Sequence, residues 1–342
     1  MKNANLITKL AAVIMVAILF VRCSEDTPAP VNYTISGNVT YPDFNGTATA
    51  ADGAVVYVSI DGSANPTATT VANTSGDYVF AELPNGTYTV WANFDNQNTN
   101  NAGGRMMNVM FMGEGVEVVL ADANATQNIA LASAGQQEAV SVNTNEGGDW
   151  NQDWNHSVVR FEFPYDQENA PYSGQFKTKE IYVNFNPSDL ANSTISAEID
   201  LLTIYTDSPG GRDPLYNSDG TFYQDPADDS YKLGCISGTF GVSSPDDTDR
   251  YATFESTSIE AYGDGYLATG PMVFNGVTSD VHVFFQYIPG FDGTNRGGDP
   301  TRFSSFQASF DFAAKAVYGI ESGHVLDADV TVHASFQITK AL

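Results

Sequence analysis

The stretch "WNQDWNHSVVRFEF", Trp150 to Phe163, gathers side chains that could carry out chemistry. Asp153, His156 and Ser157 are the residue types of a nucleophilic triad, which needs all three side chains within hydrogen-bond reach. Successive side chains of a β-strand point to opposite faces, so His156 and Ser157 would diverge in the alternating run that follows. We therefore interpret His156 as structural or as a polar contact at one end of a β-barrel, and we predict no catalytic residue.

The other candidates for metal or acid–base chemistry are scattered. His282 and His333 alternate with apolar neighbours, as outward strand positions do, and His324 falls in a predicted loop. The acidic runs "DPADDS" and "SPDDTD" offer oxygen atoms to Ca²⁺, but neither has the EF-hand spacing, and we prefer the interpretation of solvated loops. No zinc motif and no distinct carboxylate pair is present. We expect no metal, no cofactor and no enzymatic turnover.

The composition excludes several classes of partner. The chain has 342 residues, long enough for two domains, and a formal net charge of −27 from 41 acidic and 14 basic residues. So few cations cannot neutralise phosphates, which argues against a nucleic-acid partner and against docking on an anionic membrane through protein charge. Two cysteines, Cys23 and Cys235, do not make a disulfide framework, and we expect Cys235 to be a small buried residue.

The N-terminal residues have the features of an export signal. The run "MKNANLITKLAAVIMVAILFVRC" starts with positive charge and continues with an apolar segment of signal-peptide length. It resembles a bacterial lipoprotein signal, which implies a signal peptide over 1–22, acylation of Cys23, a tether over 23–30 and an outer-membrane location in the cell envelope. The following "SED" is similar to the export tag of some surface lipoproteins. Val21 and Arg22 stand where such signals have small residues, so an uncleaved signal anchor is the alternative.

The sequence of residues 31–134 predicts a β-sandwich. Short alternating runs such as "YTISGNVTY", "AVVYVSI" and "TYTVWANF" are separated by turns rich in Gly, Asn, Asp and Pro. Their order, and "TSGDYVFAELPNGTYTVWA" above all, resembles the carboxypeptidase-regulatory-like (transthyretin-like) family, which implies a prealbumin-like sandwich. We interpret the domain as a rigid spacer. The alternative is glycan binding through Tyr88, Trp91 and Phe94, although aromatics at alternate strand positions are more often core.

A polar linker over 135–148 precedes a second all-β domain over 149–342. Long alternating runs such as "SVVRFEF", "IYVNFN", "ISAEIDLLTIYT" and "FQASFDFAAKA" predict about eight strands, each with one apolar and one polar face. No helical segment could cover the apolar face of an open sheet. Closing the sheet buries that face and removes both edges, so we predict an eight-stranded antiparallel β-barrel.

Seven stretches of this domain resemble, in order, the YceI-like polyisoprenoid-binding barrels. They are "DWNHSVVRFEF", "SGQFKTKEIYVNF", "STISAEIDLLTIYT", "GGRDPLY", "YATFESTSIE", "YLATGPMVFNGVTSDVHVFF" and "FQASFDFAAKAVYGI". The resemblance implies a lipocalin-like barrel that binds one extended apolar ligand, a polyisoprenoid or quinone-like lipid. The sequence departs from the family in the extra residues 217–250 and in a longer polar loop over 290–302, both expected near a barrel mouth.

Alternation and resemblance together predict the residues that line the ligand. They are Phe161, Phe163, Ile199, Phe254, Phe310, Phe312 and Phe336. A packed core is the alternative, and a slip of one residue would reverse every assignment. The predicted function is carriage or storage of the lipid by an outer-membrane lipoprotein. Two other functions stay open: a surface glycan- or protein-binding lipoprotein that uses the sandwich and the long loops, and a hydrolase that uses His156 or the acidic loops.

Overall fold

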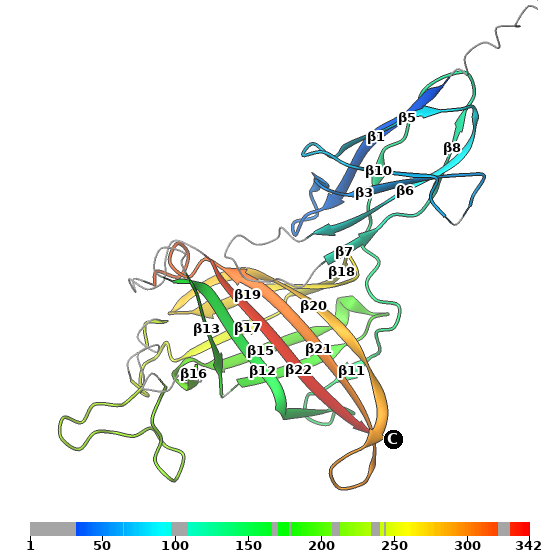
Figure 1. The fold of residues 1–342 in the computed structure, drawn as a ribbon. Helices are drawn as coiled ribbons and strands as arrows, with labels where there is room; N and C mark the ends of the chain where they lie inside the picture. Colours follow the sequence, from blue (N-terminus) through cyan, green and yellow to red (C-terminus); the bar gives the residue numbers. More distant parts are fainter. Residues whose placement is uncertain are drawn as a thin grey trace, which may run out of the picture.

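The computed structural model describes residues 32–63, 65–96, 109–165, 170–177, 179–206, 213–233, 240–242, 244–320 and 329–342. These residues form three β-sheets (Figure 1). No helix long and apolar enough to cross a membrane occurs among them. The predictions for the signal peptide, Cys23, Cys235 and His324 lie outside the described residues.

The first domain is a sandwich of two five-stranded sheets. Its strands alternate between buried and accessible residues, most regularly in β6, so each sheet turns an apolar face toward the other. One sheet contains β1 (Tyr33–Pro42), β2 (Ala48–Ala50), β5 (Asp77–Leu83), β9 (Ala125–Thr126) and β10 (Ile129–Ala130). The other contains β3 (Val55–Ile60), β4 (Ala68–Val71), β6 (Gly86–Asn96), β7 (Val109–Met112) and β8 (Val116–Leu120).

The second domain is built from one curled sheet. Its first strands are β11 (Val142–Asn143), β12 (Asn151–Tyr165), β13 (Ala170–Phe176), β14 (Lys179–Phe185), β15 (Thr194–Asp200) and β16 (Ile204–Tyr205). The later strands are β17 (Tyr251–Glu255), β18 (Ser258–Tyr262), β19 (Gly265–Phe274), β20 (Val277–Thr294), β21 (Pro300–Phe312) and β22 (Val330–Ala341). Two 3₁₀ turns, η1 (Leu190–Asn192) and η2 (Leu201–Thr203), complete the elements. The short β11 arises within the range expected as linker and pairs with β14.

The sheet closes into a barrel through antiparallel pairs. Strands β14, β15, β17, β19, β20, β21, β22, β12 and β13 are paired in that order. Only residues 177 and 178 separate β13 from β14, so the last strand of the path continues directly into the first. Strands β15 and β16 are likewise two parts of one segment, and β16 pairs with β13. If β13 with β14, and β15 with β16, are each counted as one strand, the described residues form a closed barrel of eight strands, as the sequence predicts.

Aromatic rings fill one part of the barrel interior. Phe185 lies 4.9 Å from Tyr266, 5.6 Å from Phe285 and 5.8 Å from Phe306, measured between ring centroids, and each contact is edge-on. Edge-to-face packing of this kind is the favourable arrangement for aromatic side chains. Gln136 lies beside this cluster, because its side chain bonds both the N–H and the C=O of Tyr287. This part of the barrel is a packed core.

The two segments that depart from the YceI-like pattern, 217–250 and 290–302, have different structures. The expected polar loop over 290–302 is wrong, because β20 and β21 continue through it as a paired hairpin with only residues 295–299 between them. The alternation is hidden there by glycines and by a register shift between Ile288 and Phe291. The extra residues 217–250 are largely irregular where described, with isolated bridges Tyr216–Phe222 and Gln224–Tyr231.

The sandwich packs against the outer wall of the barrel. Tyr262, Leu267 and Phe284 belong to the same buried cluster as the sandwich core. The rings of Tyr262 and Phe111 meet edge-on at 5.2 Å, and Phe44 lies 5.2 Å from Tyr262 on the other side. Figure 1 shows β7 beside β18 at this contact. The two domains are therefore joined through a shared apolar cluster and not through the linker alone.

Candidate functional site

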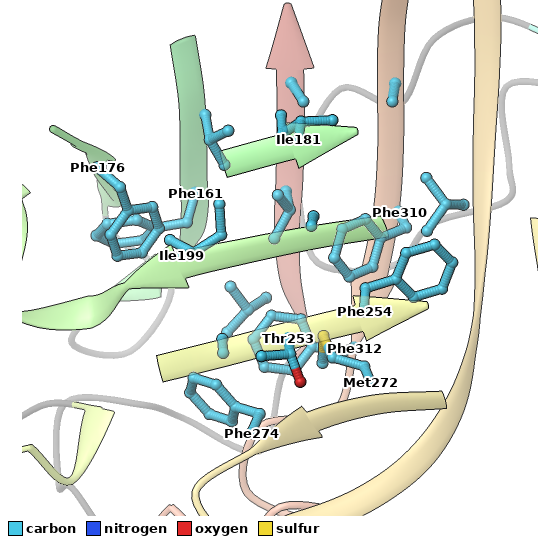
Figure 2. A pocket seen from close by; sticks show the side chains of 18 of the residues that line it. Phe161, Phe176, Ile181, Ile199, Thr253, Phe254, Met272, Phe274, Phe310 and Phe312 are labelled. Atoms are coloured by element: carbon cyan, nitrogen blue, oxygen red, sulfur yellow. The ribbon is translucent and has the colours of Figure 1, made fainter. Parts of the chain in front are cut away.

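The barrel encloses an apolar cavity of about 140 Å³ away from its aromatic core. Figure 2 shows rings from opposite walls, among them Phe161, Phe254 and Phe310, directed into this space. Every lining residue except Thr253 has an apolar side chain. The lining residues are Val159, Phe161, Phe176, Ile181, Ile195, Ala197, Ile199, Leu201, Phe240, Ala252, Thr253, Phe254, Met272, Phe274, Val283, Ala308, Phe310, Phe312, Val330, Val332 and Ala334.

The interior is hollow because small residues share the inward face with large ones. Ala197 on β15 lies opposite Phe254 on β17, and Ala308 on β21 lies opposite Ala334 on β22. Each of these alanines is only partly buried, although it sits at an inward position of a closed wall. An alanine leaves the volume of a larger side chain unfilled, and an apolar cavity of this size stays dry and can bind a benzene-sized molecule.

The structure places five of the predicted lining residues around the cavity. These are Phe161, Ile199, Phe254, Phe310 and Phe312. Their inward direction follows from alternation with polar outward positions such as Arg160 and Glu162.

Phe163 and Phe336 do not line the cavity, although both are buried at inward positions. Phe163 is covered by neighbours, since its ring stacks at 6.1 Å on Phe161. Phe336 lies further along the barrel, where it is the register partner of Phe306 in the aromatic core. Alternation fixes the face on which a side chain lies, but not its depth along the barrel.

The sequence prediction misses Phe240, which closes one side of the cavity. Its ring meets Phe161 edge-on at 5.0 Å and Phe274 at 5.7 Å. It comes from the extra segment 217–250, together with the buried residues Leu233 and Val242. The sequence signal is the set of apolar side chains in "LGCISGTFGV", residues 233–242, inside a polar stretch. The extra segment thus contributes to the barrel interior rather than only to a mouth.

His156 lies on the surface near one end of β12. Its Nδ1 is 2.8 Å from Asp153 Oδ2, and its side chain is 67% exposed. Ser157 turns the other way, because its hydroxyl donates to the Asp153 carbonyl at 2.7 Å and accepts from the Gln337 N–H at 3.1 Å. A register shift between Asp153 and Val158 makes room for this arrangement. His156 and Ser157 therefore do not form a nucleophile–base pair.

Two carboxylates of the first acidic loop, those of Asp225 and Asp228, have partners close by in the sequence. Asp228 accepts from the N–H and hydroxyl of Ser230, and these hydrogen bonds hold the pKa of Asp228 below its ordinary value. Asp225 pairs with Lys232. No group of three or more His, Cys, Asp or Glu side chains is arranged to hold a metal ion in the parts of the chain that the structure describes.

The aromatic residues proposed for glycan binding by the sandwich separate into two environments. Tyr88 and Phe94 are buried in its core. Trp91 is partly exposed and stacks on Tyr57 with ring centroids 5.2 Å apart and planes at 12°. Of the three residues, Trp91 is the one accessible to a ligand, with Tyr57 beside it.

No protein-family model matches the chain, and no curated protein matches it. Among solved structures similar to it is BcnA of Burkholderia cenocepacia, 18% identical, with 55% of this chain and 99% of that chain covered at a TM-score of 0.38. The YceI protein of Campylobacter jejuni is 12% identical, with 49% and 85% covered at a TM-score of 0.31. A DUF3823 family protein of Parabacteroides merdae is 12% identical, with 49% and 90% covered at a TM-score of 0.20. At these identities the likeness concerns the fold alone.

Proposed function

We propose that the barrel binds the apolar chain of one isoprenoid or quinone-like lipid, without turnover. The observation that carries the proposal is the interior cavity, with its uniformly apolar lining. The resemblance of seven ordered stretches to the YceI-like barrels supports the same ligand class. A cavity of about 140 Å³ has room for a group close to benzene in size, which matches a single five-carbon isoprene unit. Burial of five carbons stabilises a complex by about 4 kcal/mol.

We further propose that the protein carries or stores this lipid as an outer-membrane lipoprotein. The signal-like segment and the position of Cys23 support the anchor. The close packing of Tyr262, Leu267 and Phe284 against the sandwich supports the role of that domain as a rigid spacer.

The test is to purify the full chain from a Gram-negative host and to combine native mass spectrometry with organic extraction. One isoprenoid-like lipid per protein is the expected result. Ala197→Phe fills the cavity and should abolish the bound lipid. Ser196→Phe adds the same side chain to the outward face of β15 and should retain it. A lipid-free wild-type protein that also shows no thermal shift with quinones and polyprenyl lipids would overturn the proposal.

The stacked pair Trp91 and Tyr57 supports a second candidate, a glycan-binding surface on the sandwich. Exposed aromatic faces are the surfaces on which sugar rings stack. Glycan-array binding that is lost in Trp91→Ala but survives Ala197→Phe would identify this function. Equal array signals for wild type and Trp91→Ala would remove it.

A further inference from the structure

Two neighbouring segments of the barrel wall, β13–β14 and β15–β16, are interrupted at the same height along the barrel. Strand β13 ends at Phe176 and β14 begins at Lys179, while η2 separates β15 from β16 beside them. The inward positions change from even to odd numbers across this interruption, as the pairs Val159–Phe176 and Ile181–Ala197 show. A backbone hydrogen bond from the Lys177 N–H to the Thr203 C=O, 3.0 Å long, spans it. We call this place the wall break.

Phe176 is the partition between the inside and the outside at the wall break. Phe176 lines the interior cavity, where its ring lies 5.4 Å from that of Phe161. It also lines a hollow of about 500 Å³ on the outer surface, the outer hollow, together with Lys177, Lys179 and Tyr216. Phe176 therefore borders both spaces, and a chain that joins them must pass its side chain.

Two lysine side chains lie at the wall break, although the protein as a whole is strongly acidic. Lys177 and Lys179 are two of only 14 basic residues, against 41 acidic ones. The Lys177 ammonium lies 4.4 Å from the centre of the Tyr216 ring. Lys179 occupies an inward position opposite Ile199, a cavity residue, and it is partly buried. Burial lowers the pKa of Lys179 because desolvation disfavours its charged form.

Neither lysine is neutralised by a carboxylate in the part of the chain that the structure describes. Other cations of the barrel do form such ion pairs, among them Lys232, Arg250, Arg302 and Lys340. Asp213 also lines the outer hollow, but its Oδ1 accepts from the N–H and the hydroxyl of Thr206 at 2.8 and 2.7 Å. A partly buried, unpaired ammonium is costly, and an anionic ligand would remove that cost.

We propose that the outer hollow is a head-group site and that the ligand is an apolar chain ending in an anionic group, a phosphate monoester or a carboxylate. This inference rests on the proposed function, since the chain enters the interior cavity past Phe176. The ammonium groups of Lys177 and Lys179 donate hydrogen bonds to the anion. The cavity has room for only one isoprene unit at the far end of the chain, so the anionic head group and the chain next to it lie outside the wall, in the outer hollow.

The test compares farnesyl monophosphate, farnesol and a saturated fifteen-carbon carboxylate by calorimetric titration of the full chain. Wild type should bind the phosphate about tenfold more tightly than farnesol, and a carboxylate bound as tightly would extend the site to fatty acids. The double variant Lys177→Gln/Lys179→Gln should lose this preference and bind the phosphate no more tightly than it binds farnesol. Lys232→Gln, which removes a cation paired with Asp225, is the control and should keep the preference.

The outcomes separate the two proposals. Farnesol binding with no preference for the phosphate in wild type, or a preference that survives the double variant, overturns the head-group site and leaves the lipid-binding barrel intact. Absence of binding by all three probes overturns both. Phe176→Ala supplies an independent measurement, because removal of the partition should raise the association rate of farnesyl monophosphate in stopped-flow fluorescence. An unchanged rate would contradict entry at the wall break.

Discussion

The guanidinium of Arg250 holds the carboxylate of Asp200 through two hydrogen bonds, from Nε to Oδ1 at 2.9 Å and from Nη2 to Oδ2 at 2.6 Å. Asp200 is 4% exposed, and its Oδ1 also accepts from the Leu202 N–H where η2 begins. The hydrogen bond with Asp200 raises the pKa of Arg250 above its ordinary value. The pair thus fixes the point at which β15 stops and the wall break starts.

Replacement of Arg250 by leucine should destabilise the protein by about 3 kcal/mol, because it leaves the Asp200 carboxylate buried without its partner. The free energy of unfolding in urea measures this loss. Arg302→Leu is the matched control, since Arg302 makes an equally bidentate pair with Asp292 on an exposed hairpin. Solvent screens that pair, so its removal should cost far less. Equal losses in the two variants would contradict a structural role for burial at Asp200.

The alternation of apolar and polar residues was sufficient to predict the barrel and the face on which its side chains lie. Phe161 and Phe310 point inward as expected, since every second residue of a strand faces the same way. Alternation carries no information on depth, and Phe336 therefore lies in the aromatic core rather than at the cavity. The wall break was not predictable, because the change of register near Lys177 has no distinct residue pattern.

The contact between the domains is visible in the sequence as consecutive apolar residues, which interrupt the alternation of apolar and polar positions. In β20, Phe284 interrupts the expected polar face, and Leu267 does so in β19. Consecutive apolar residues in a strand indicate that both faces are covered. The sandwich covers the outer face here, and the register of such a contact depends on residues distant in sequence, such as Phe111.

The apolar ring of Phe240 should be essential to the barrel interior. Phe240→Ala removes a fully buried ring that packs on Phe161 and Phe274, and we expect a loss of about 3–5 kcal/mol in the free energy of unfolding. Leu215→Ala, just before the extra segment, is the control, since Leu215 is 51% exposed and its truncation should change stability by less than about 0.5 kcal/mol. Chemical denaturation of both variants gives the comparison, and a loss below about 1 kcal/mol at Phe240 would mean that the extra segment merely rests on the barrel.

Gly263 should be required for the domain contact. A Cβ at this position would lie 2.5 Å from Val109 Cγ1 and 2.9 Å from the Met110 carbonyl, and its φ of +53° disfavours other residues. Gly263→Ala should therefore cost about 3 kcal/mol and split thermal unfolding into two transitions. Gly62 also has a positive φ but open space around its Cβ position, so Gly62→Ala should cost about 1 kcal/mol and keep one transition. A single transition for Gly263→Ala would show that the domains do not depend on this contact.

Asp311 should make stability depend on pH. Burial, with a smaller contribution from Asp329, raises the pKa of this carboxyl to about 7, in a hollow that it shares with Asp280, His282 and Phe44. Its Oδ1 accepts no hydrogen bond from the described residues.

Between pH 4 and 7 the folded protein keeps a proton on Asp311 that the unfolded chain has lost, so stability falls as pH rises through this range and then levels off. Asp311→Asn cannot ionise and should be more stable than wild type at pH 8, by on the order of 2 kcal/mol because partial exposure screens the charge. The difference should shrink as the pH falls and vanish at about pH 2.5, below the ordinary pKa of 3.8, where wild-type Asp311 is protonated in both states. Urea unfolding at the two pH values measures it, with the exposed Glu117→Gln as a control that shows no such trend. A pH-independent difference between Asp311→Asn and wild type would mean that packing, rather than the buried charge, sets the stability at this site.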